Sequence, residues 1–286
     1  MAITFGIDVS EYQAQIDWQQ VRDAGKTFAI LRCGYGRFSS QIDRRFLRNY
    51  EQAKEAGMHT GAYLFSYALD PAQAREEAEN CLRLIRGMQF EYPVVYDVET
   101  AAQKKLGRDK LSAVARSFCE TMEERGYYVS IYANLDFLEN NLTSEVTSRF
   151  DIWLAQWAQK PTYTGAFGMW QYSASGRVPG IQGPVDLDAA YKDYPAIMRR
   201  NGLNGFAPPS ARGTNLYTGM PVAMNGTPLY ATPQTPYPSG RVSGTYYLYD
   251  TQPAGGRYRV TNRRGYAGMR PAMLFVTGWI DGSVLE

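Results

Sequence analysis

Histidine and cysteine are scarce in this sequence, which has one histidine and three cysteines among 286 residues. The lone histidine, His59, excludes a two-histidine metal site, and any catalytic serine or cysteine paired with histidine would have to use it. His59 falls between a predicted helix and a predicted strand, at the end of the sheet opposite the usual active-site end, so we expect a structural role. Because Cys33, Cys81 and Cys119 lie far apart and form no C-x-x-C pair, we predict buried thiols and neither disulfides nor a zinc site.

Long apolar runs and an excess of one charge are also missing. No stretch approaches the roughly 18 apolar residues of a membrane span. The N-terminus starts with a strand-like pattern and lacks the basic region, apolar stretch and cleavage site of a secretion signal. The formal net charge is only +2, and no basic stripe is interleaved with aromatic residues. We therefore expect neither a membrane nor a nucleic acid as partner.

The first two hundred residues alternate between strand-like and helix-like segments. The helical segments carry apolar residues at helical spacing and several end near a glycine, while the strands are rich in aromatic or β-branched residues. Five strand–helix units are predicted, at 3–8 with 17–25, 28–33 with 44–56, 61–67 with 71–86, 93–99 with 110–125, and 127–133 with 136–140. Three strand-like runs follow with no room for a long helix between them, at 151–157, 167–172 and 185–188.

Eight strands are the number that closes an α/β barrel. The sequence therefore predicts an α/β fold over residues 1–200, an incomplete TIM-like barrel of five βα units followed by three strands. An open doubly wound sheet is the alternative. That fold's glycine fingerprint after the first strand is missing, because Gly6 is followed by Ile-Asp-Val-Ser.

The composition changes after the barrel. Residues 201–215 are rich in Gly, Asn and Pro and are predicted to be a linker. Residues 213–286 contain no Lys, eight Tyr, and six Arg against three acidic residues, in short alternating runs. We predict a small, mildly cationic all-β barrel domain over residues 216–286.

Carboxylates must carry any catalytic chemistry in the barrel. Asp97 and Glu99, two residues apart at the end of the fourth strand, project to the same side, and Asp8 ends the first strand. Asp186 and Asp188 share a side of the eighth strand, which in a closed barrel neighbours the first. Crowded acids raise the pKa of at least one of them, and a protonated acid beside ionised partners is what glycosidic cleavage requires.

Metal binding by the same cluster is the competing chemistry. Without histidine it would be an all-oxygen magnesium or calcium site, and no phosphate-binding glycine loop accompanies it. We therefore expect no metal and no cofactor.

The predicted barrel mouth is also rich in aromatic residues, whose faces pack against sugar rings, and in side chains that hydrogen-bond hydroxyls and amides. Individually, each aromatic residue is more often part of the core, because alternation lets only about half of each strand's side chains face the lumen. The candidate substrate-binding residues are Arg32, Tyr35, Tyr63, Phe65, Tyr132, Gln156, Gln171 and Asp188.

Several motifs, in order, resemble the glycoside hydrolase family 25 lysozymes, which include many phage endolysins. The resemblance spans about residues 3–195 and is carried by Gly6-Ile-Asp-Val-Ser10, Ile30-Leu-Arg-Cys-Gly-Tyr-Gly36, Gly61-Ala-Tyr-Leu-Phe-Ser66, Val95-Tyr-Asp-Val-Glu99, Ile131-Tyr132, Trp153-Leu-Ala155, Trp170-Gln-Tyr-Ser173 and Val185-Asp186.

This resemblance implies N-acetylmuramidase activity on bacterial peptidoglycan. It implies Glu99 as general acid, Asp97 as its partner, and Asp8 and Asp186 as supporting acids, with Asp188 the alternative to Asp186. Leu64 stands where many relatives carry His, which predicts an altered substrate contact. A non-catalytic carbohydrate-binding barrel is the alternative function.

The tail is similar to bacterial Src-homology-type modules that hold cell walls. A stability or dimerisation module is the alternative. The resemblance to endolysins implies a protein that stays in the host cytoplasm, without a signal peptide, until it is released to act on the wall.

Overall fold

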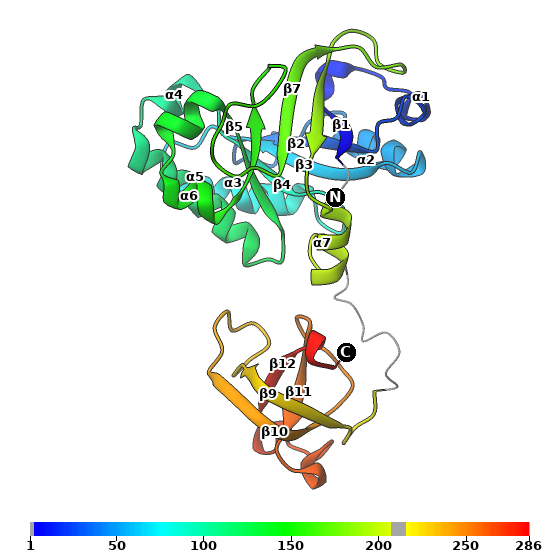
Figure 1. Cartoon of the computed structure of the whole chain (residues 1–286), viewed down its shortest axis with the longest axis vertical. Coiled ribbons are helices and arrows are strands. Elements are labelled where there is room, and N and C mark those ends of the chain that lie inside the picture. Colours follow the sequence, from blue (N-terminus) through cyan, green and yellow to red (C-terminus); the bar gives the residue numbers. More distant parts are fainter. Residues whose placement is uncertain (1–2, 207–215, 286) are drawn as a thin grey trace. The chain divides into compact units, whose positions relative to one another are not determined.

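The computed structural model describes residues 3–206 and 216–285, which divide into two compact units (Figure 1). Among the described residues, the first unit contains 3–198 and 203–206, and the second contains 199–202 and 216–285. Part of the predicted linker, residues 207–215, lies outside the described residues. In the described residues, no helix is long and apolar enough to cross a membrane.

Eight strands close the first unit into a barrel, as the sequence predicts. Strands β1 to β7 run parallel to one another in chain order. The strands are β1 (Thr4–Val9), β2 (Phe28–Tyr35), β3 (His59–Phe65), β4 (Val94–Asp97), β5 (Val129–Asn134), β6 (Asp151–Ala155), β7 (Met169–Gly176) and β8 (Val185–Ala190).

The last strand reverses direction. β8 forms an antiparallel hairpin with β7 and pairs antiparallel with β1 to complete the barrel. The mouth formed by the C-terminal ends of β1 to β7 therefore lies at the N-terminal end of β8. Asp186 pairs with Asp8 near this mouth, whereas Asp188 pairs with Gly6, two residues deeper.

Helices cover the outside of the barrel, mainly between the first five strands. The predicted helices after β1 to β4 are confirmed, with ends that differ by a few residues, and the segment after β5 forms a π-helical turn. The helices are α1 (Trp18–Asp23), α2 (Phe46–Glu55), α3 (Pro71–Leu84), α4 (Ala101–Lys104), α5 (Arg108–Glu123), α6 (Ser144–Arg149) and α7 (Tyr194–Asn201), with the short helical turns η1 (Glu11–Gln13) and η2 (Phe137–Asn141).

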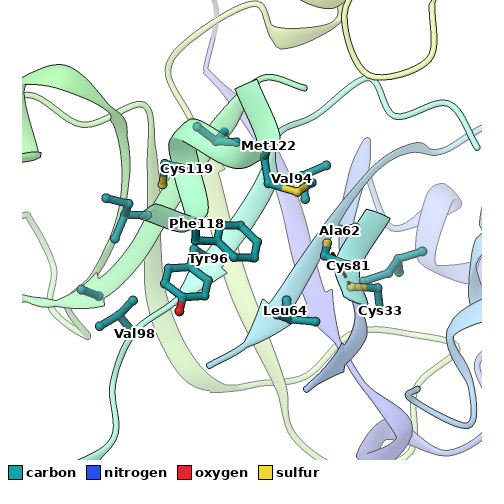
Figure 2. Close-up of a cluster of buried hydrophobic side chains, with 14 of the residues drawn as sticks. Cys33, Ala62, Leu64, Cys81, Val94, Tyr96, Val98, Phe118, Cys119 and Met122 are labelled. Carbon is teal, nitrogen blue, oxygen red and sulfur yellow. Dashed lines mark hydrogen bonds between the residues drawn. The ribbon is translucent and has the colours of Figure 1, made fainter. Parts of the chain in front are cut away.

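The outer core packs α3 and α5 against the strands (Figure 2). Phe118 of α5 stacks on Tyr96 of β4 with ring centroids 3.9 Å apart. All three cysteines are buried and free, as predicted, and the sulfurs of Cys33 and Cys81 are 3.9 Å apart. Leu64 is fully buried in this core.

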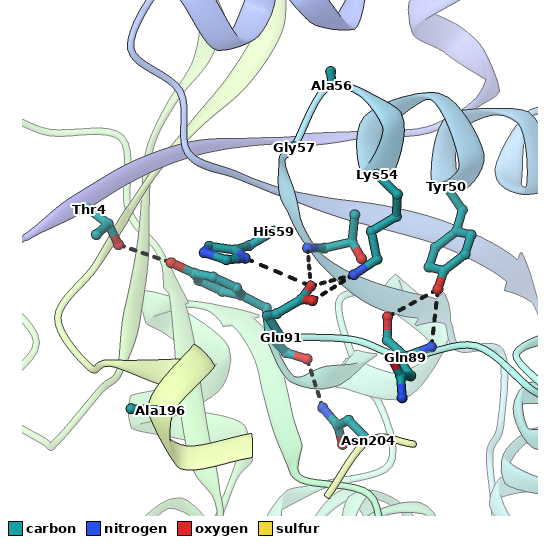
Figure 3. Close-up of polar contacts among 12 residues, drawn as sticks. Thr4, Tyr50, Lys54, Ala56, Gly57, His59, Gln89, Glu91, Ala196 and Asn204 are labelled. Carbon is teal, nitrogen blue, oxygen red and sulfur yellow. Dashed lines mark hydrogen bonds and ion pairs between the residues drawn. The ribbon is translucent and has the colours of Figure 1, made fainter. Parts of the chain in front are cut away.

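Polar contacts close the other end of the barrel (Figure 3). The Lys54 ammonium lies 2.6 and 2.7 Å from the two carboxylate oxygens of Glu91. His59 Nδ1 is 4.0 Å from Glu91, at the N-terminal end of β3. The structure thus places His59 in a polar network far along the strand from the mouth, as expected.

Residues 203–206 add a clamp at this end of the barrel. The Asn204 side chain donates to the carbonyl oxygen of Tyr92 at 2.8 Å and accepts from the Tyr128 amide at 2.7 Å. The Phe90 amide donates to the carbonyl of Asn204. Asn204 is completely buried and adopts a φ of 54°, a left-handed conformation that asparagine tolerates better than most residues.

The second unit is an antiparallel sheet of four strands in the order β12-β11-β10-β9. A bridge between Tyr230, just after β9, and Trp279 of β12 joins the two edge strands. Buried residues such as Leu248, Val260 and Ile280 form its own core. The elements are β9 (Pro221–Leu229), β10 (Gly240–Leu248), β11 (Arg257–Thr261) and β12 (Gly278–Asp281), with short helical turns at Arg264–Tyr266, Ala272–Leu274 and Gly282–Leu285.

Candidate active site

A cavity of about 280 Å³ opens at the mouth of the barrel. Most of the side chains that line it were predicted from the sequence as catalytic or substrate-binding. They are Asp8, Arg32, Tyr63, Phe65, Asp97, Glu99, Tyr132, Gln171 and Asp186.

Three acids from β1 and β8 form one cluster. Residues directly opposite on antiparallel strands point to the same face, so the pairing of Asp8 with Asp186 brings both carboxyls to the mouth. Asp188 lies beneath them, completely buried, and accepts a hydrogen bond of 2.9 Å from the indole Nε1 of Trp153. Asp8 and Asp188 are close enough that the charge state of each affects the pKa of the other. Two ionised carboxylates offer no donor, so a hydrogen bond between them would require one of them to be protonated.

The environment disfavours charge on this trio. Burial, followed by repulsion from Asp188 and Asp186, raises the pKa of Asp8 well above its ordinary value. Burial raises the pKa of Asp188 to about 8, although the Trp153 hydrogen bond opposes the rise. Burial also raises the pKa of Asp186. The trio therefore retains at least one proton near neutral pH.

The second acid pair follows β4. Asp97 is the last residue of the strand and is buried, whereas Glu99 is two residues further and exposed, just before the Thr100 cap of α4. The Oδ1 atom of Asp97 is buried and has no hydrogen-bond partner among residues 3–206 and 216–285. A buried acceptor without a donor is costly, which makes this atom a candidate contact for a ligand.

Both pKa values of this pair are raised. For Asp97 the causes are burial and then repulsion from Glu99, with Arg32 opposing the rise. For Glu99 they are loss of hydration and then repulsion from Asp186. The mouth thus contains an accessible acid, Glu99, that is easier to keep protonated than a free glutamic acid, which is the requirement for proton donation to a leaving group.

Gln171 connects the acids to the aromatic wall. Its Nε2 donates to Asp8 Oδ2 at 2.7 Å, and its Oε1 accepts from Tyr132 Oη and Trp157 Nε1, both at 3.0 Å. Tyr132 packs edge-on against Trp153 with centroids 4.7 Å apart. Trp157 is 65% exposed and held by its indole nitrogen, so its ring stays available to a ligand.

Arg32 is fixed by acids of neighbouring loops. Its Nε donates to Asp43 at 2.8 Å and its terminal nitrogen donates to Glu11 at 3.1 Å. The guanidinium lies 5.1 Å from the centre of the Tyr12 ring. Arg32 therefore supplies positive charge close to Asp97 from a rigid position.

Three predicted site residues do not line the cavity. Asp188 lies below it, and Gln156 is satisfied by Thr162, to which it donates at 2.6 Å and from which it accepts at 2.8 Å. Tyr35 packs edge-on against Tyr67. Leu64 also lies outside the cavity lining and belongs to the outer core, which contradicts the altered substrate contact predicted there.

Sequence reasoning missed the residues that follow β1. Tyr12 and Gln13 line the cavity from η1, where Gln13 and Ser10 form a capping box. The Ser-x-x-Gln spacing just after a strand end is a signal that could have placed them there. Trp153, which the sequence singles out only within a family motif, and Trp157 also line the cavity, and neither was among the predicted substrate-binding residues.

Comparisons with known proteins agree with this geometry. The model of the glycosyl hydrolases family 25 matches residues 7–181. The autolytic lysozyme of Clostridium acetobutylicum is 30% identical over 184 residues, which are 64% of this chain and 54% of that protein. The modular autolysin LytC of Streptococcus pneumoniae has a TM-score of 0.60 and 27% identity over 66% of this chain and 47% of its own.

A third match covers nearly the whole chain. The spore cortex lytic enzyme SleM of Clostridium perfringens aligns with 98% of this chain and 87% of its own, with a TM-score of 0.60 and 19% identity, which shows a similar fold. This chain thus spans about half the length of the Clostridium acetobutylicum and Streptococcus pneumoniae proteins that it matches.

Proposed function

Because the chain belongs to the glycosyl hydrolases family 25, we propose that it is a muramidase that hydrolyses β-1,4 glycosidic bonds of bacterial peptidoglycan. The observation that carries this proposal is the set of acids in one aromatic-walled cavity, namely Asp8, Asp97, Glu99 and Asp186. The lysozyme and autolysin names of the relatives agree with it.

Glu99 is the proposed general acid. It is the exposed member of its pair and its pKa is raised, so it can hold a proton and deliver it to the glycosidic oxygen as the bond to C1 of the sugar breaks. Asp8 and Asp186 are the supporting acids. The negative charge that this partly protonated cluster keeps stabilises the positive charge that develops at C1.

Asp97 is the proposed partner that orients the substrate. Its unpartnered Oδ1 can accept from the N–H of the sugar's 2-acetamido group, which turns the acetamido oxygen toward C1 as the nucleophile. Water then opens the cyclic intermediate, and the product retains its configuration. The alternative is an inverting reaction with a carboxylate-activated water, and proton NMR of the first-formed anomer distinguishes the two.

The substitution Glu99→Gln tests the proposal. We expect new reducing ends from purified walls to fall by about 10² to 10⁴ while the fold is retained, because the amide cannot donate the proton. An amidase or peptidase would release free amino groups from the same walls. Release of reducing ends at the wild-type rate by the variant would refute the assignment of Glu99.

We further propose that the second unit is a cell-wall-binding module of the bacterial Src-homology type, joined by a linker within residues 201–215. Its support is a small β-sheet with its own core and the arginine-rich, lysine-free composition of this part of the chain. A labelled fragment of residues 208–286 should sediment with purified Gram-positive walls. Failure to sediment with walls of every species tried would leave this unit with a structural role.

A further inference from the structure

A second hollow of about 910 Å³ lies outside the barrel and is separate from the catalytic cavity. We call it the outer groove. It is bounded by the segment leading into α1, by one face of α2, and by the connection between β7 and β8. Its α2 wall contains Arg45, Arg48 and Gln52, which recur three and four residues apart and so lie on one side of the helix.

The groove lies between α2 and the start of α1. Its lining follows α2 from Arg45 to Ala56 and includes only Trp18 to Gln20 of α1. The opposite wall is fixed by backbone pairing, since Ile16 bridges to Ile181 and the Asp17 amide donates to the carbonyl of Gly180 at 2.9 Å. Gly180 has a φ of +92°, and a Cβ there would lie 2.3 Å from the carbonyl oxygen of Asp17, so this close approach requires glycine.

The lining carries hydrogen-bonding groups that the fold leaves unused. The indole Nε1 of Trp18 is buried and has no hydrogen-bond partner within residues 3–206 and 216–285. Arg45 is half-buried, and its side chain makes no hydrogen bond or ion pair within residues 3–206 and 216–285. Amides make up most of the rest of the polar lining. Gln19, Gln20 and Gln52 already bond to Asp23, Asp17 and Arg48 through one side-chain atom each, and Gln15 and Gln182 complete the set.

This chemistry is that of a carbohydrate site. Neutral amides exchange hydrogen bonds with hydroxyl and acetamido groups, while Ile16, Trp18 and Ile181 supply apolar contact. The basic residues Arg45 and Arg48 face the acidic residues Asp17 and Glu55 in the same lining, so the groove has no strong excess of one charge. A largely neutral polymer with occasional carboxylates fits this balance better than a polyanion does.

The groove adjoins the catalytic cavity through one short segment. Ser10, Tyr12 and Gln13 line the cavity, and Ala14 and Gln15 line the groove. The change occurs at Ala14, whose φ of 54° and ψ of −125° are strained for a residue with a side chain. One glycan-binding surface can therefore continue from the other.

We propose that the outer groove binds a second stretch of the peptidoglycan glycan while the catalytic cavity holds the first. This inference rests on the proposed function and deepens it, because it assigns the same polymer two contacts on one barrel. Only long or insoluble glycan would use both contacts. A short soluble fragment would occupy the cavity alone.

Retention of the full chain on insoluble walls tests the groove, in a Glu99→Gln background that does not consume the polymer. We expect Arg45→Ala/Arg48→Ala to raise the apparent Kd about tenfold, the factor for losing two hydrogen bonds. Gln52→Trp should act similarly by filling the groove. The control, Arg75→Ala/Arg86→Ala, removes the same charge from elsewhere on the barrel and should leave retention unchanged.

Cleavage assays with Glu99 intact complete the test. The groove variants should cleave a tetrasaccharide of alternating N-acetylglucosamine and N-acetylmuramic acid at the wild-type rate and cleave walls more slowly. Equal wall retention by groove and control variants would overturn the groove. So would a loss seen only on walls that still carry their anionic polymers and absent after hydrofluoric acid treatment. If the parent chain cleaved no glycan but the groove variants still lost retention, the proposed function would fail and the groove would stand.

Discussion

The substitution Asp188→Asn should stabilise the barrel at alkaline pH. Asp188 is completely buried, and burial raises its pKa from 3.8 to about 8. An acid whose pKa is higher in the folded state stabilises the fold fully below its unfolded pKa, and this contribution is lost as pH rises through the folded value. Asparagine cannot ionise, so the variant keeps this stability as the pH rises.

The geometry favours asparagine over other neutral residues. Its Oδ1 can still accept from Trp153, which now donates to Asp188 Oδ1 at 2.9 Å. Its Nδ2 can donate toward Asp8, a hydrogen bond that two ionised carboxylates cannot form. The rise in the pKa of Asp188 from 3.8 to about 8 corresponds to a loss of at most about 6 kcal/mol in the free energy of unfolding at alkaline pH, at 1.36 kcal/mol per pKa unit. Part of this loss belongs to Asp8, because the two acids titrate together.

Urea unfolding from pH 4 to pH 9 measures the effect. The stabilities of the two proteins should nearly coincide at pH 4 and separate by several kcal/mol at pH 8 to 9. Asp186→Asn, at a half-buried site, is the control and should give a smaller separation. A constant difference at all pH values, or a wild-type barrel that gains as much stability with pH as the variant, would refute the reasoning. Tryptophan fluorescence reports on the barrel through Trp18, Trp153, Trp157 and Trp170.

Three further substitutions test other contacts in the barrel. Asp186→Asn removes a charge that raises the pKa of Glu99, so the alkaline limb of activity, where Glu99 loses its proton, should move to lower pH in a pH–rate profile. Gln171→Leu breaks the links to Asp8, Tyr132 and Trp157 and should lower kcat about 10- to 100-fold without changing the circular dichroism spectrum. Phe118→Ala should cost about 3 to 5 kcal/mol in urea unfolding, because the buried ring stacks on Tyr96, and should leave KM unchanged.

Local patterns sufficed to predict the barrel and most of its mouth. Each strand of β1 to β7 reads as a short apolar or aromatic run, and the carboxyl ends of parallel strands meet at one edge, so Asp8 and Asp97 could be placed there from order alone. The depth of Asp188 was not predicted, because it depends on the direction of β8. The 8 residues 177–184 between β7 and β8 are too few for a parallel crossover, and this spacing already indicates a hairpin.

Other parts of the site depend on contacts that no periodicity encodes. Tyr12 lines the cavity because the turn η1 follows directly after β1. Gln156 is held away from the cavity by its hydrogen bonds to Thr162. The outer groove depends on how α2, the start of α1 and the connection between β7 and β8 come together, including the backbone contact at Gly180. Such features are set by tertiary packing.

The clamp at Asn204 determines how the barrel would respond to mechanical load. Residues 203–206 are the last described residues of the barrel unit, and Asn204 bonds to the segments that precede β4 and β5, at the far end from Asp97 and Glu99. If the later residues are held by an insoluble wall, tension along the chain first reaches residues 203–206, including the hydrogen bond from Gln89 to the Gly205 carbonyl and those of Asn204. Peeling would therefore begin at residues 203–206 and at the entrances of these two strands, while the acids at the opposite ends of the strands would be displaced last.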